Sequence, residues 1–361
     1  MRVGIDILFL LPGRVGGTET YAWALIEELI GRRGVEVVLF TNSSTRVPQH
    51  VAAKAEVVTL KLSGESRTHR LWTVQTTLPG AAEKLGVDLV HSLGSTCPFR
   101  ARLPVIVTIH DANWSAIPMP LAKRIGLAVM TRLSAKAAHS VITVSEFSKR
   151  ELVRWLGIPP DKVRVALSGI GRDTADVRWE DSQSAPYVFA LGGDGKNKNI
   201  EALIRAFRAV RREFGGCRLV IAGHTNSAVR RMAADDAGIE LRGFVERREL
   251  LDLYARATAF VMPSLYEGFG IPLAEAMAIG APCVSSAAGA LKEVGEDAVV
   301  SFDAGRGEDL AGALRSVLGS TSLRQELSRR GRIRAGAFSW ALAADVTLSC
   351  YEDAVAGQGS A

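Results

Sequence analysis

Short apolar runs alternate with helical periods along most of the chain, and this alternation predicts an α/β fold. Runs rich in valine, isoleucine, leucine and alanine predict strands, and helix-length segments separate them. The predicted strands cover residues 3–11, 35–41, 87–92, 105–110, 141–144, 163–167, 187–191, 218–222, 240–245, 259–262, 283–285 and 298–302. Continuous apolar strands with helices between them are typical of parallel sheets that are covered on both faces.

A polar stretch divides these strands into two sets. Twelve strands are too many for one compact doubly wound domain, and residues 169–186 are rich in Asp, Arg, Gly and Ser, which is typical of a linker. We therefore expect an N-terminal domain over residues 1–168 and a C-terminal domain over residues 187–338. The pattern is helical from residue 302 to the end, and residues 339–361 form a last helical segment.

The composition agrees with two domains and indicates a reducing compartment. At about 100–200 residues per domain, 361 residues correspond to two domains. No apolar run approaches the roughly 18 residues of a membrane span, and Asp6 interrupts the first run too early for a signal peptide. The four cysteines are scattered, without a C-x-x-C pair, so neither a disulfide framework nor a zinc site is expected. We predict a cytoplasmic protein.

The charge permits anionic partners without indicating a nucleic acid. The net charge is +6 and the sequence pI about 9.3, which favours contact with anionic lipid or a phosphorylated ligand. The basic residues are dispersed and no basic–aromatic motif of the RNA-binding kinds is present. Segments 61–75 and 119–136 are basic and partly amphipathic. They either contact lipid headgroups peripherally at the inner membrane face or form ordinary solvated helix faces.

Residues 263–278 carry the most informative pattern, with two glutamates eight positions apart, Glu267 and Glu275. Pro272 suits the first turn of a helix, where its missing N–H costs nothing. Glu267 is therefore expected in the strand-to-helix loop and Glu275 in the first helical turn. The intervening glycines leave backbone amides accessible. Carboxylates and free N–H groups at the carboxyl end of a strand suit a sugar; the alternative is an ordinary loop with two surface acids.

A glycine-rich turn with lysines follows the strand predicted at 187–191 and suits an anion. Gly193, Lys196 and Lys198 lie in this turn, and Asn199 is a good N-cap for the helix that follows. A helix N-terminus with adjacent cations is a natural phosphate site. The sequence is neither a Walker A loop nor a clean Rossmann fingerprint, and a solvated lysine turn is the alternative.

Three further strand ends in the first half carry candidate residues. Gly16 and Gly17 form a turn that permits close backbone approach to a ligand. His110 and Asp111 end a buried strand, where side chains reach the binding edge of a sheet, although a lone histidine there is more often structural. Ser145 is expected to cap the helix that follows it.

The segment from Glu267 to Glu275, with its flanking Pro-Ser and Gly-Phe-Gly-Ile-Pro, resembles the E-x7-E motif of retaining glycosyltransferases of family 4, group 1. Matches run in the family's order from residue 16 to residue 340. The resemblance implies the α/β GT-B fold, with two Rossmann-like, doubly wound parallel-sheet domains that face an interdomain cleft. It assigns acceptor binding to the N-terminal domain and nucleotide-sugar binding to the C-terminal one, with the last helix returning to the N-terminal domain.

The resemblance also implies the site residues. Lys198 would contact the donor diphosphate, Glu267 the hexose hydroxyls and His110 the donor sugar, and these three would be catalytic. The implied donor-binding residues are Gly16, Gly17, Asp111, Gly193, Lys196, Asn199, Phe244, Val245, Gly268, Phe269, Gly270 and Glu275. At residues 244–245 the backbone would contact the nucleobase, with the Phe244 ring in the core. The chain departs from the family pattern, in which one arginine follows the strand and another directly precedes the lysine. Here Gly192 or Gly193 takes the first place and Asn197 the second.

The expected activity is transfer of a hexose from a nucleotide-diphosphate sugar to a glycan, lipid-linked or small-molecule acceptor, with retention of configuration. GDP-mannose is favoured over UDP-sugars, because family members with a Gly-Gly and a Lys-Asn loop often use it. No D-x-D lies where a metal would be expected, so we expect neither a metal nor a cofactor besides the donor. The alternatives are a GT-B epimerase or phosphorylase and a non-catalytic sugar-nucleotide-binding protein.

Overall fold

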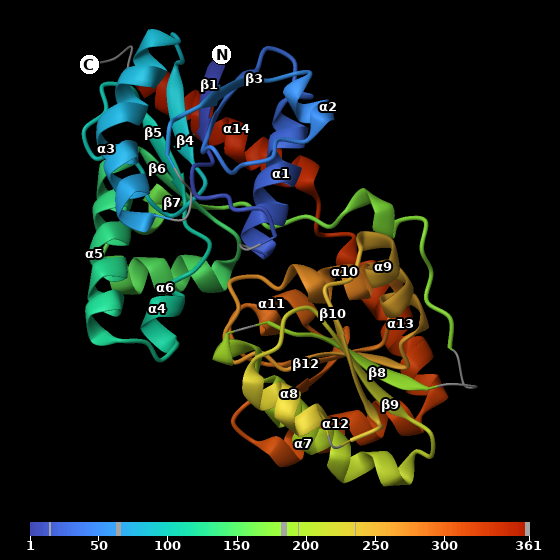
Figure 1. The fold of residues 1–361 in the computed structure, drawn as a ribbon. Coiled ribbons are helices and arrows are strands. Elements are labelled where there is room, and N and C mark those ends of the chain that lie inside the picture. Colours follow the sequence, from blue (N-terminus) through green and yellow to red (C-terminus); the bar gives the residue numbers. More distant parts are fainter. Residues whose placement is uncertain (14–15, 63–65, 182–185, 194, 235, 358–361) are drawn as a thin grey trace. The chain divides into compact units, whose positions relative to one another are not determined.

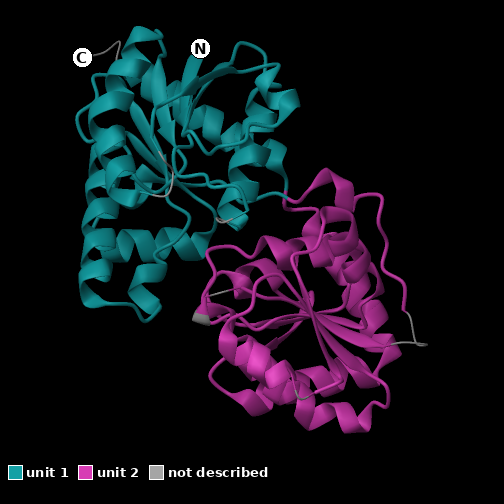
Figure 2. Cartoon of the chain, in the orientation of Figure 1, with its two compact units in different colours: residues 1–169, 339–361 teal, residues 170–338 magenta. Residues whose placement is uncertain are grey.

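The chain forms two compact units in a computed structural model, which describes residues 1–13, 16–62, 66–181, 186–193, 195–234 and 236–357. Unit 1 comprises Met1–Gly169 and Ser339–Ala361, and unit 2 comprises Ile170–Phe338 (Figure 2). Each unit is an α/β domain with helices on both sides of one sheet (Figure 1). Within the described residues, no helix combines the length and the apolar content needed to cross a membrane.

Unit 1 is built on a seven-stranded sheet with the order β3-β2-β1-β4-β5-β6-β7, in which every neighbouring pair is parallel. Its strands are β1 (Arg2–Asp6), β2 (Glu36–Thr41), β3 (Glu56–Thr59), β4 (Leu89–Ser92), β5 (Val105–Thr108), β6 (Ser140–Thr143) and β7 (Val163–Val165). Its helices are α1 (Gly17–Leu29), α2 (Gln49–Ala52), α3 (Arg67–Lys84), α4 (Asn113–Ala116), α5 (Leu121–Ala137), α6 (Glu146–Leu156) and α14 (Trp340–Ala356). The chain leaves β1 in both directions across the sheet, which is the doubly wound arrangement.

Unit 2 has a six-stranded parallel sheet with the order β10-β9-β8-β11-β12-β13. Its strands are β8 (Tyr187–Leu191), β9 (Arg218–Ala222), β10 (Ile239–Gly243), β11 (Ala259–Met262), β12 (Cys283–Ser286) and β13 (Val299–Phe302). Its helices are α7 (Ile200–Val210), α8 (Ser227–Ala234), α9 (Arg247–Arg256), α10 (Ile271–Ile279), α11 (Leu291–Gly295), α12 (Gly307–Gly319) and α13 (Thr321–Ala335). Each of the twelve predicted strands corresponds to one of the thirteen strands of the two sheets.

The strand that the sequence did not predict is β3, at the edge of the first sheet. Three of its four residues are exposed and the fourth is half-buried, so it lacks the apolar run of a central strand. The first predicted strand is also shorter than expected, because β1 ends at Asp6 while the apolar residues that follow it are buried in a loop. Burial without strand pairing explains why the apolar pattern continues beyond the strand.

The predicted linker is wrong over most of its length, because residues 170–181 pack on unit 2. The Trp179 indole donates a hydrogen bond to the Ala257 carbonyl at 2.7 Å, and the Trp179 amide donates to the Ile279 carbonyl at 3.0 Å. Asp181 forms an ion pair with the buried Arg324 at 2.9 Å. The polar residues that suggested a linker are therefore partners of unit 2, while residues 182–185 lie outside the described ranges.

A helix cap and the contacts of the last helix position the elements of unit 1. The Ser145 hydroxyl accepts a hydrogen bond from the Ser148 amide at 3.0 Å, which confirms the predicted N-cap of α6. Helix α14 lies in unit 1, where Tyr351 is fully buried and its hydroxyl is hydrogen-bonded to His91 Nδ1 at 2.7 Å. Arg32 also pairs with Asp345 of α14 at 2.8 Å. The last helix is thus part of the core of unit 1.

Candidate active site

An ion pair between Lys198 and Glu267 lies at the carboxyl edge of the unit 2 sheet. Lys198 ends a short 3-10 turn after β8, and Glu267 lies in the loop after β11. Because β8 and β11 are neighbours in the sheet, the two loops are adjacent although 69 positions separate the residues. The Lys198 ammonium contacts Glu267 Oε1 at 2.8 Å, and both side chains are partly buried. A cation and a carboxylate are therefore presented together at the edge where α/β sheets bind ligands.

The backbone of Glu267 is held by a glycine that the sequence analysis did not select. Gly289 has φ +64°, and a Cβ on it would lie 2.6 Å from the Glu267 carbonyl oxygen and 2.8 Å from the Glu267 nitrogen. The neighbouring Ala290 amide donates a hydrogen bond to the same carbonyl at 3.0 Å. On the other side, the Leu265 amide donates to the Asn197 carbonyl at 2.7 Å, which ties the loop to the Lys198 turn.

The turn around Lys198 is also tightly packed. A Cβ on Gly193 would lie 3.0 Å from Lys198 Cγ, so a larger residue at position 193 would crowd the Lys198 side chain. Asn199 occupies the N-cap position of α7, but the predicted capping bond is wrong, because its backbone is left-handed and its side chain donates instead to the Pro263 carbonyl at 3.1 Å. That bond links the turn to the end of β11. The side chain of Lys196 lies outside the described part of the structure.

Glu275 belongs to a second ion pair, and its predicted place in the first turn of the helix is wrong. It is the fifth residue of α10, only 4% exposed, and its Oε1 accepts from the Arg247 guanidinium at 2.7 Å. Burial raises the pKa of the Glu275 carboxyl, and the ion pair opposes that shift. Arg247 also donates to both Asp173 oxygens, at 2.7 and 2.8 Å, and these bonds together with the one to Glu275 raise the pKa of Arg247.

Arg247 is a partner of the predicted site residue Glu275 that sequence reasoning missed. It is the first residue of α9 and is one of many dispersed arginines, so nothing local distinguishes it. Its relevance arises from its two carboxylate partners, which come from residues 74 positions before it and 28 after it. The sequence analysis selected Glu275 but did not predict its burial. Once that burial is known, a cationic partner is expected, because a buried carboxylate needs a cation.

Of the remaining predicted residues of unit 2, some are buried in its core and others are exposed. Phe269 is buried with its ring edge-on to Phe338 at 5.3 Å, and Gly268 precedes it in the loop. Gly270 has φ +105° at the start of α10. Phe244 is 74% exposed, so the prediction of a core ring is wrong; the register of β10 shifts just before it, at the edge of the sheet. The adjacent Val245 is half-buried.

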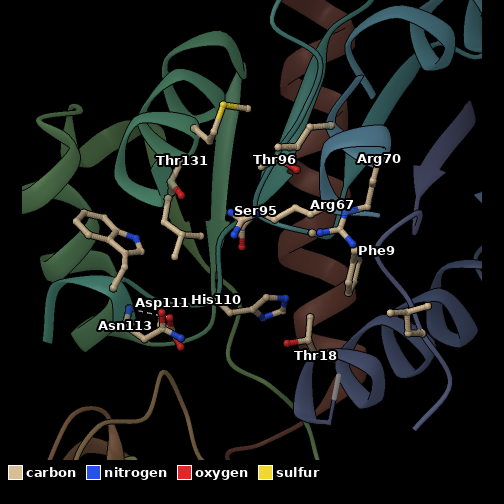
Figure 3. A pocket seen from close by; sticks show the side chains of 16 residues that line it. Phe9, Thr18, Arg67, Arg70, Ser95, Thr96, His110, Asp111, Asn113 and Thr131 are labelled. Carbon is tan, nitrogen blue, oxygen red and sulfur yellow. Dashed lines mark hydrogen bonds between the residues drawn. The ribbon is translucent and has the colours of Figure 1, made fainter. Parts of the chain in front are cut away.

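Unit 1 has its own cavity, about 400 Å³ in volume, at the carboxyl ends of its strands (Figure 3). His110 and Asp111 follow β5 and line it, as does Thr18 of α1. Gly16 and Gly17 directly precede Thr18 at the start of α1. Four residues predicted for the donor site are thus brought to one region of unit 1.

His110 is held as a neutral imidazole. Its Nε2 donates to the Leu93 carbonyl at 3.3 Å, and its ring lies edge-on to Tyr21 with 4.8 Å between centroids. Burial lowers the pKa of His110 to about 4, so the ring is uncharged at neutral pH and its Nδ1 is an acceptor. Asp111 accepts a hydrogen bond from the Asn113 amide at 2.9 Å, which supports the loop.

Two arginines of α3, Arg67 and Arg70, also line this cavity and bring positive charge to it. Segment 61–75 was predicted to be a basic, partly amphipathic stretch, but neither arginine was selected as a site residue. Among the residues that the structure describes, no group of three or more His, Cys, Asp or Glu side chains is placed to hold a metal ion.

Comparison with known proteins identifies the family. The model of "Glycosyltransferase Family 4" matches residues 15–173, and that of "Glycosyl transferases group 1" matches residues 172–334. An uncharacterized glycosyltransferase of Methanocaldococcus jannaschii is 30% identical in an alignment 319 residues long that covers 78% of this chain and 80% of that protein. The chain belongs to glycosyltransferase family 4, group 1.

Two further comparisons show what the chain is similar to in sequence and in fold. The O-antigen chain mannosyltransferase B of Escherichia coli is 30% identical in an alignment 241 residues long that covers 61% of this chain and 62% of that protein. The solved structure of sucrose-phosphate synthase from Thermosynechococcus elongatus matches with a TM-score of 0.82 at 19% identity, covering 99% of this chain and 100% of that one. These findings confirm the predicted family and the GT-B fold class.

Proposed function

We propose that this family 4 glycosyltransferase moves a hexose from a nucleotide-diphosphate sugar to an acceptor hydroxyl with retention of anomeric configuration. The ion pair between Lys198 and Glu267 is the observation that carries the proposal, because it presents a cation for a diphosphate and a carboxylate for sugar hydroxyls in one loop cluster. The alternatives, a GT-B epimerase and a non-catalytic sugar-nucleotide-binding protein, would bind the same donor without transferring its sugar.

The chemistry follows from where charge develops. As the bond between the anomeric carbon and the phosphate oxygen breaks, its electron pair passes to the diphosphate, and the Lys198 ammonium stabilises that charge. The acceptor oxygen bonds to the anomeric carbon on the same face, and its proton passes to the leaving phosphate. Glu267 accepts hydrogen bonds from the hexose hydroxyls, and neutral His110 offers Nδ1 to a sugar hydroxyl. Preorganised charge of this kind often supplies the largest catalytic effect.

GDP-mannose is the donor that we favour, with UDP-sugars next. The similarity to an O-antigen chain mannosyltransferase supports mannose, although the alignment spans 62% of that relative. A thermal-shift panel of GDP, UDP, dTDP and ADP with their sugar conjugates tests this. A ligand at about 100 times its Kd adds roughly 2.7 kcal/mol of stability. Stabilisation by one base alone would identify the donor class, whereas no stabilisation by any base would contradict the proposal.

The role of Lys198 is tested by turnover with the donor found in that panel. Lys198→Ala should reduce kcat about 10²- to 10³-fold, the loss typical when one donor to a developing oxyanion is removed. Glu267→Gln should also lose turnover, because the carboxylate accepts from the hexose. Lys54→Ala removes an exposed lysine of unit 1 and is the control. Activity of Lys198→Ala equal to that of the control would show that the diphosphate binds elsewhere.

We further propose that the reaction needs no metal ion, because Lys198 supplies the positive charge that a metal would otherwise bring to the diphosphate. Turnover should be unchanged after treatment with EDTA. A loss in EDTA that Mn²⁺ restores would overturn this part of the proposal while leaving the transfer itself in place.

We also propose peripheral contact with an anionic membrane through α5. Four apolar side chains spaced four residues apart on this helix, Leu121, Ile125, Val129 and Leu133, are between 43% and 62% exposed. Residues four apart lie on one helix face. The helix carries four cations and no acidic residue. A second copy of the chain would place these cations against each other, whereas anionic lipid complements both the charge and the apolar stripe.

Flotation with phosphatidylglycerol vesicles tests the membrane contact. Wild-type protein should float with these vesicles in low salt and less in high salt, because surface charges are screened. Ile125→Glu/Val129→Glu should not float, whereas Val57→Glu, at an exposed valine of the sheet edge, should behave as wild type. Flotation of Ile125→Glu/Val129→Glu equal to that of wild type would contradict the contact.

A further inference from the structure

The cavity of unit 1 has more positive charge than the proposed contacts of His110 with a sugar require. Arg67 and Arg70 are three residues apart on α3, so they lie on the same face of the helix. Both line the cavity (Figure 3), whereas His110 and Asp111 come from the segment after β5. Asp111 is the one acidic residue among those that line the cavity in the described ranges, and its Oδ1 accepts from the Asn113 amide.

The pKa of Arg70 reflects its surroundings on the cavity wall. Burial lowers the pKa of Arg70, the positive charge of Arg67 lowers it further, and the nearby Asp6 opposes both effects. Asp6 is itself buried, and its oxygens accept hydrogen bonds from the Leu8 amide at 3.0 Å and from the Ser92 hydroxyl at 2.9 Å. The carboxylate that opposes the lowering of the Arg70 pKa is therefore already hydrogen-bonded to other groups. Arg67 is exposed, whereas Arg70 is half-buried.

An unsatisfied donor lies elsewhere on the cavity wall. Trp114 lines the cavity and is 7% exposed, and its indole Nε1 is buried with no hydrogen-bond partner among the described residues. Buried polar groups in proteins are nearly always paired, so an unpaired N–H in a residue of the cavity wall is unusual. The hydroxyls of Ser95, Thr96 and Thr131 also line the cavity. The wall thus offers two guanidinium groups at one place and hydroxyl and indole groups at others.

We propose that this cavity binds an acceptor that carries a phosphate group, with the phosphate between Arg67 and Arg70 and the hydroxylated part of the acceptor toward Thr131 and Trp114. Two guanidinium groups suit a tetrahedral dianion, because each can donate two parallel hydrogen bonds and together they balance its charge. The phosphate takes no part in bond breaking. This inference rests on the proposed function, of which it specifies the acceptor. The phosphate belongs either to a soluble phosphomonoester or to a lipid headgroup.

Binding of inorganic phosphate to the full chain, measured by titration calorimetry at constant ionic strength, tests the site. Wild-type protein should bind phosphate saturably, and Arg67→Gln/Arg70→Gln should bind at least tenfold more weakly. Arg46→Gln/Lys54→Gln removes the same charge from exposed residues of unit 1 outside the cavity, and should bind within twofold of wild type. Lys198→Ala should also retain phosphate binding, because that lysine belongs to unit 2.

Three results would overturn the inference: no saturable binding, equal binding by Arg67→Gln/Arg70→Gln and wild type, or loss of phosphate binding in Lys198→Ala alone. The nucleotide panel separates this failure from that of the proposed function, because binding of GDP or UDP without phosphate binding would refute only the acceptor site. Glycerol 3-phosphate and phosphatidylglycerol vesicles then distinguish the sources. Binding of the first that depends on both arginines supports a soluble acceptor, and such binding of the second supports a lipid-borne one.

Discussion

Replacing Gly289 by alanine should disable the proposed site without touching a side chain in it. The added methyl group would lie 2.6 Å from the Glu267 carbonyl oxygen, and ordinary contacts of a Cβ begin at 3.4 Å. Glu267 would therefore have to recede by about 0.8 Å, since the clash is with backbone and not with a flexible side chain. We expect a backbone shift of this size to disturb the 2.8 Å contact between Lys198 and Glu267, because hydrogen bonds weaken within a few tenths of an ångström beyond their optimal length.

Displacement of this size has a kinetic consequence. Moving a catalytic group by about 1 Å can reduce the rate about 10²-fold. Alanine at φ +64° adds a backbone cost of about 1–2 kcal/mol, which acts on stability. We therefore expect Gly289→Ala to lose about two orders of magnitude in kcat, while GDP or UDP still binds.

The assay needs a control for backbone strain alone. Gly216 also has a positive φ, +76°, but a Cβ on it would meet no atom within 4 Å. Gly216→Ala should therefore lose stability to a similar extent and retain its turnover. Both variants would be compared for kcat with the identified donor and for thermal unfolding. Turnover of Gly289→Ala within threefold of Gly216→Ala would refute the idea that this glycine positions Glu267.

Two further predictions concern buried charge. Arg247→Met should destabilise unit 2 by about 2–3 kcal/mol at pH 8, less than the 3–5 kcal/mol of a fully buried pair because Arg247 is 39% exposed. The loss should shrink as the pH falls, because burial raises the folded-state pKa of Glu275 and protonation removes its unpaired charge. Hydrogen exchange of unit 2 peptides would measure the loss, and a loss that does not change with pH would contradict the prediction. Burial lowers the pKa of His91 to about 3, so its contribution to stability is present above pH 6.5 and is lost as the pH falls from there toward 3. In urea unfolding, His91→Phe should reduce the pH dependence of the unfolding free energy in this range by up to about 1.4 kcal/mol per pH unit. At pH 7 the variant should be less stable by about 1–3 kcal/mol, because the buried Tyr351 hydroxyl loses its partner. An unchanged pH dependence would contradict this prediction.

The fold could be predicted because its central strands are buried on both faces and their sequences are continuously apolar. Strand β8 matches its predicted bounds, as do β9 and β11. The pattern fails where burial and strand pairing separate. Strand β3 is paired but exposed, and Ile7 and Leu8 are buried but lie outside any strand.

The site could be predicted in part, since Lys198 and Glu267 each follow a strand and a parallel sheet brings its carboxyl ends to one edge. The contacts that support them could not. Gly289 matters because it lies against the backbone of Glu267, 22 residues earlier in the sequence. Arg247 matters because it pairs with Glu275 and Asp173, which are distant from it in the sequence. Phe244 was misjudged because its aromatic side chain suggested a core position, whereas its place after an edge strand leaves it exposed.

The membership of α14 in unit 1 bears on the order in which the chain folds as it is synthesised. Unit 2 is one continuous segment, whereas unit 1 needs residues from both sides of it. When residue 338 has been added, unit 2 has all its strands and helices, but His91 still lacks Tyr351 and Arg32 still lacks Asp345. Domains usually mature from the N-terminus during translation. Here the second unit of the chain can finish first, and the unit that is begun first is completed last.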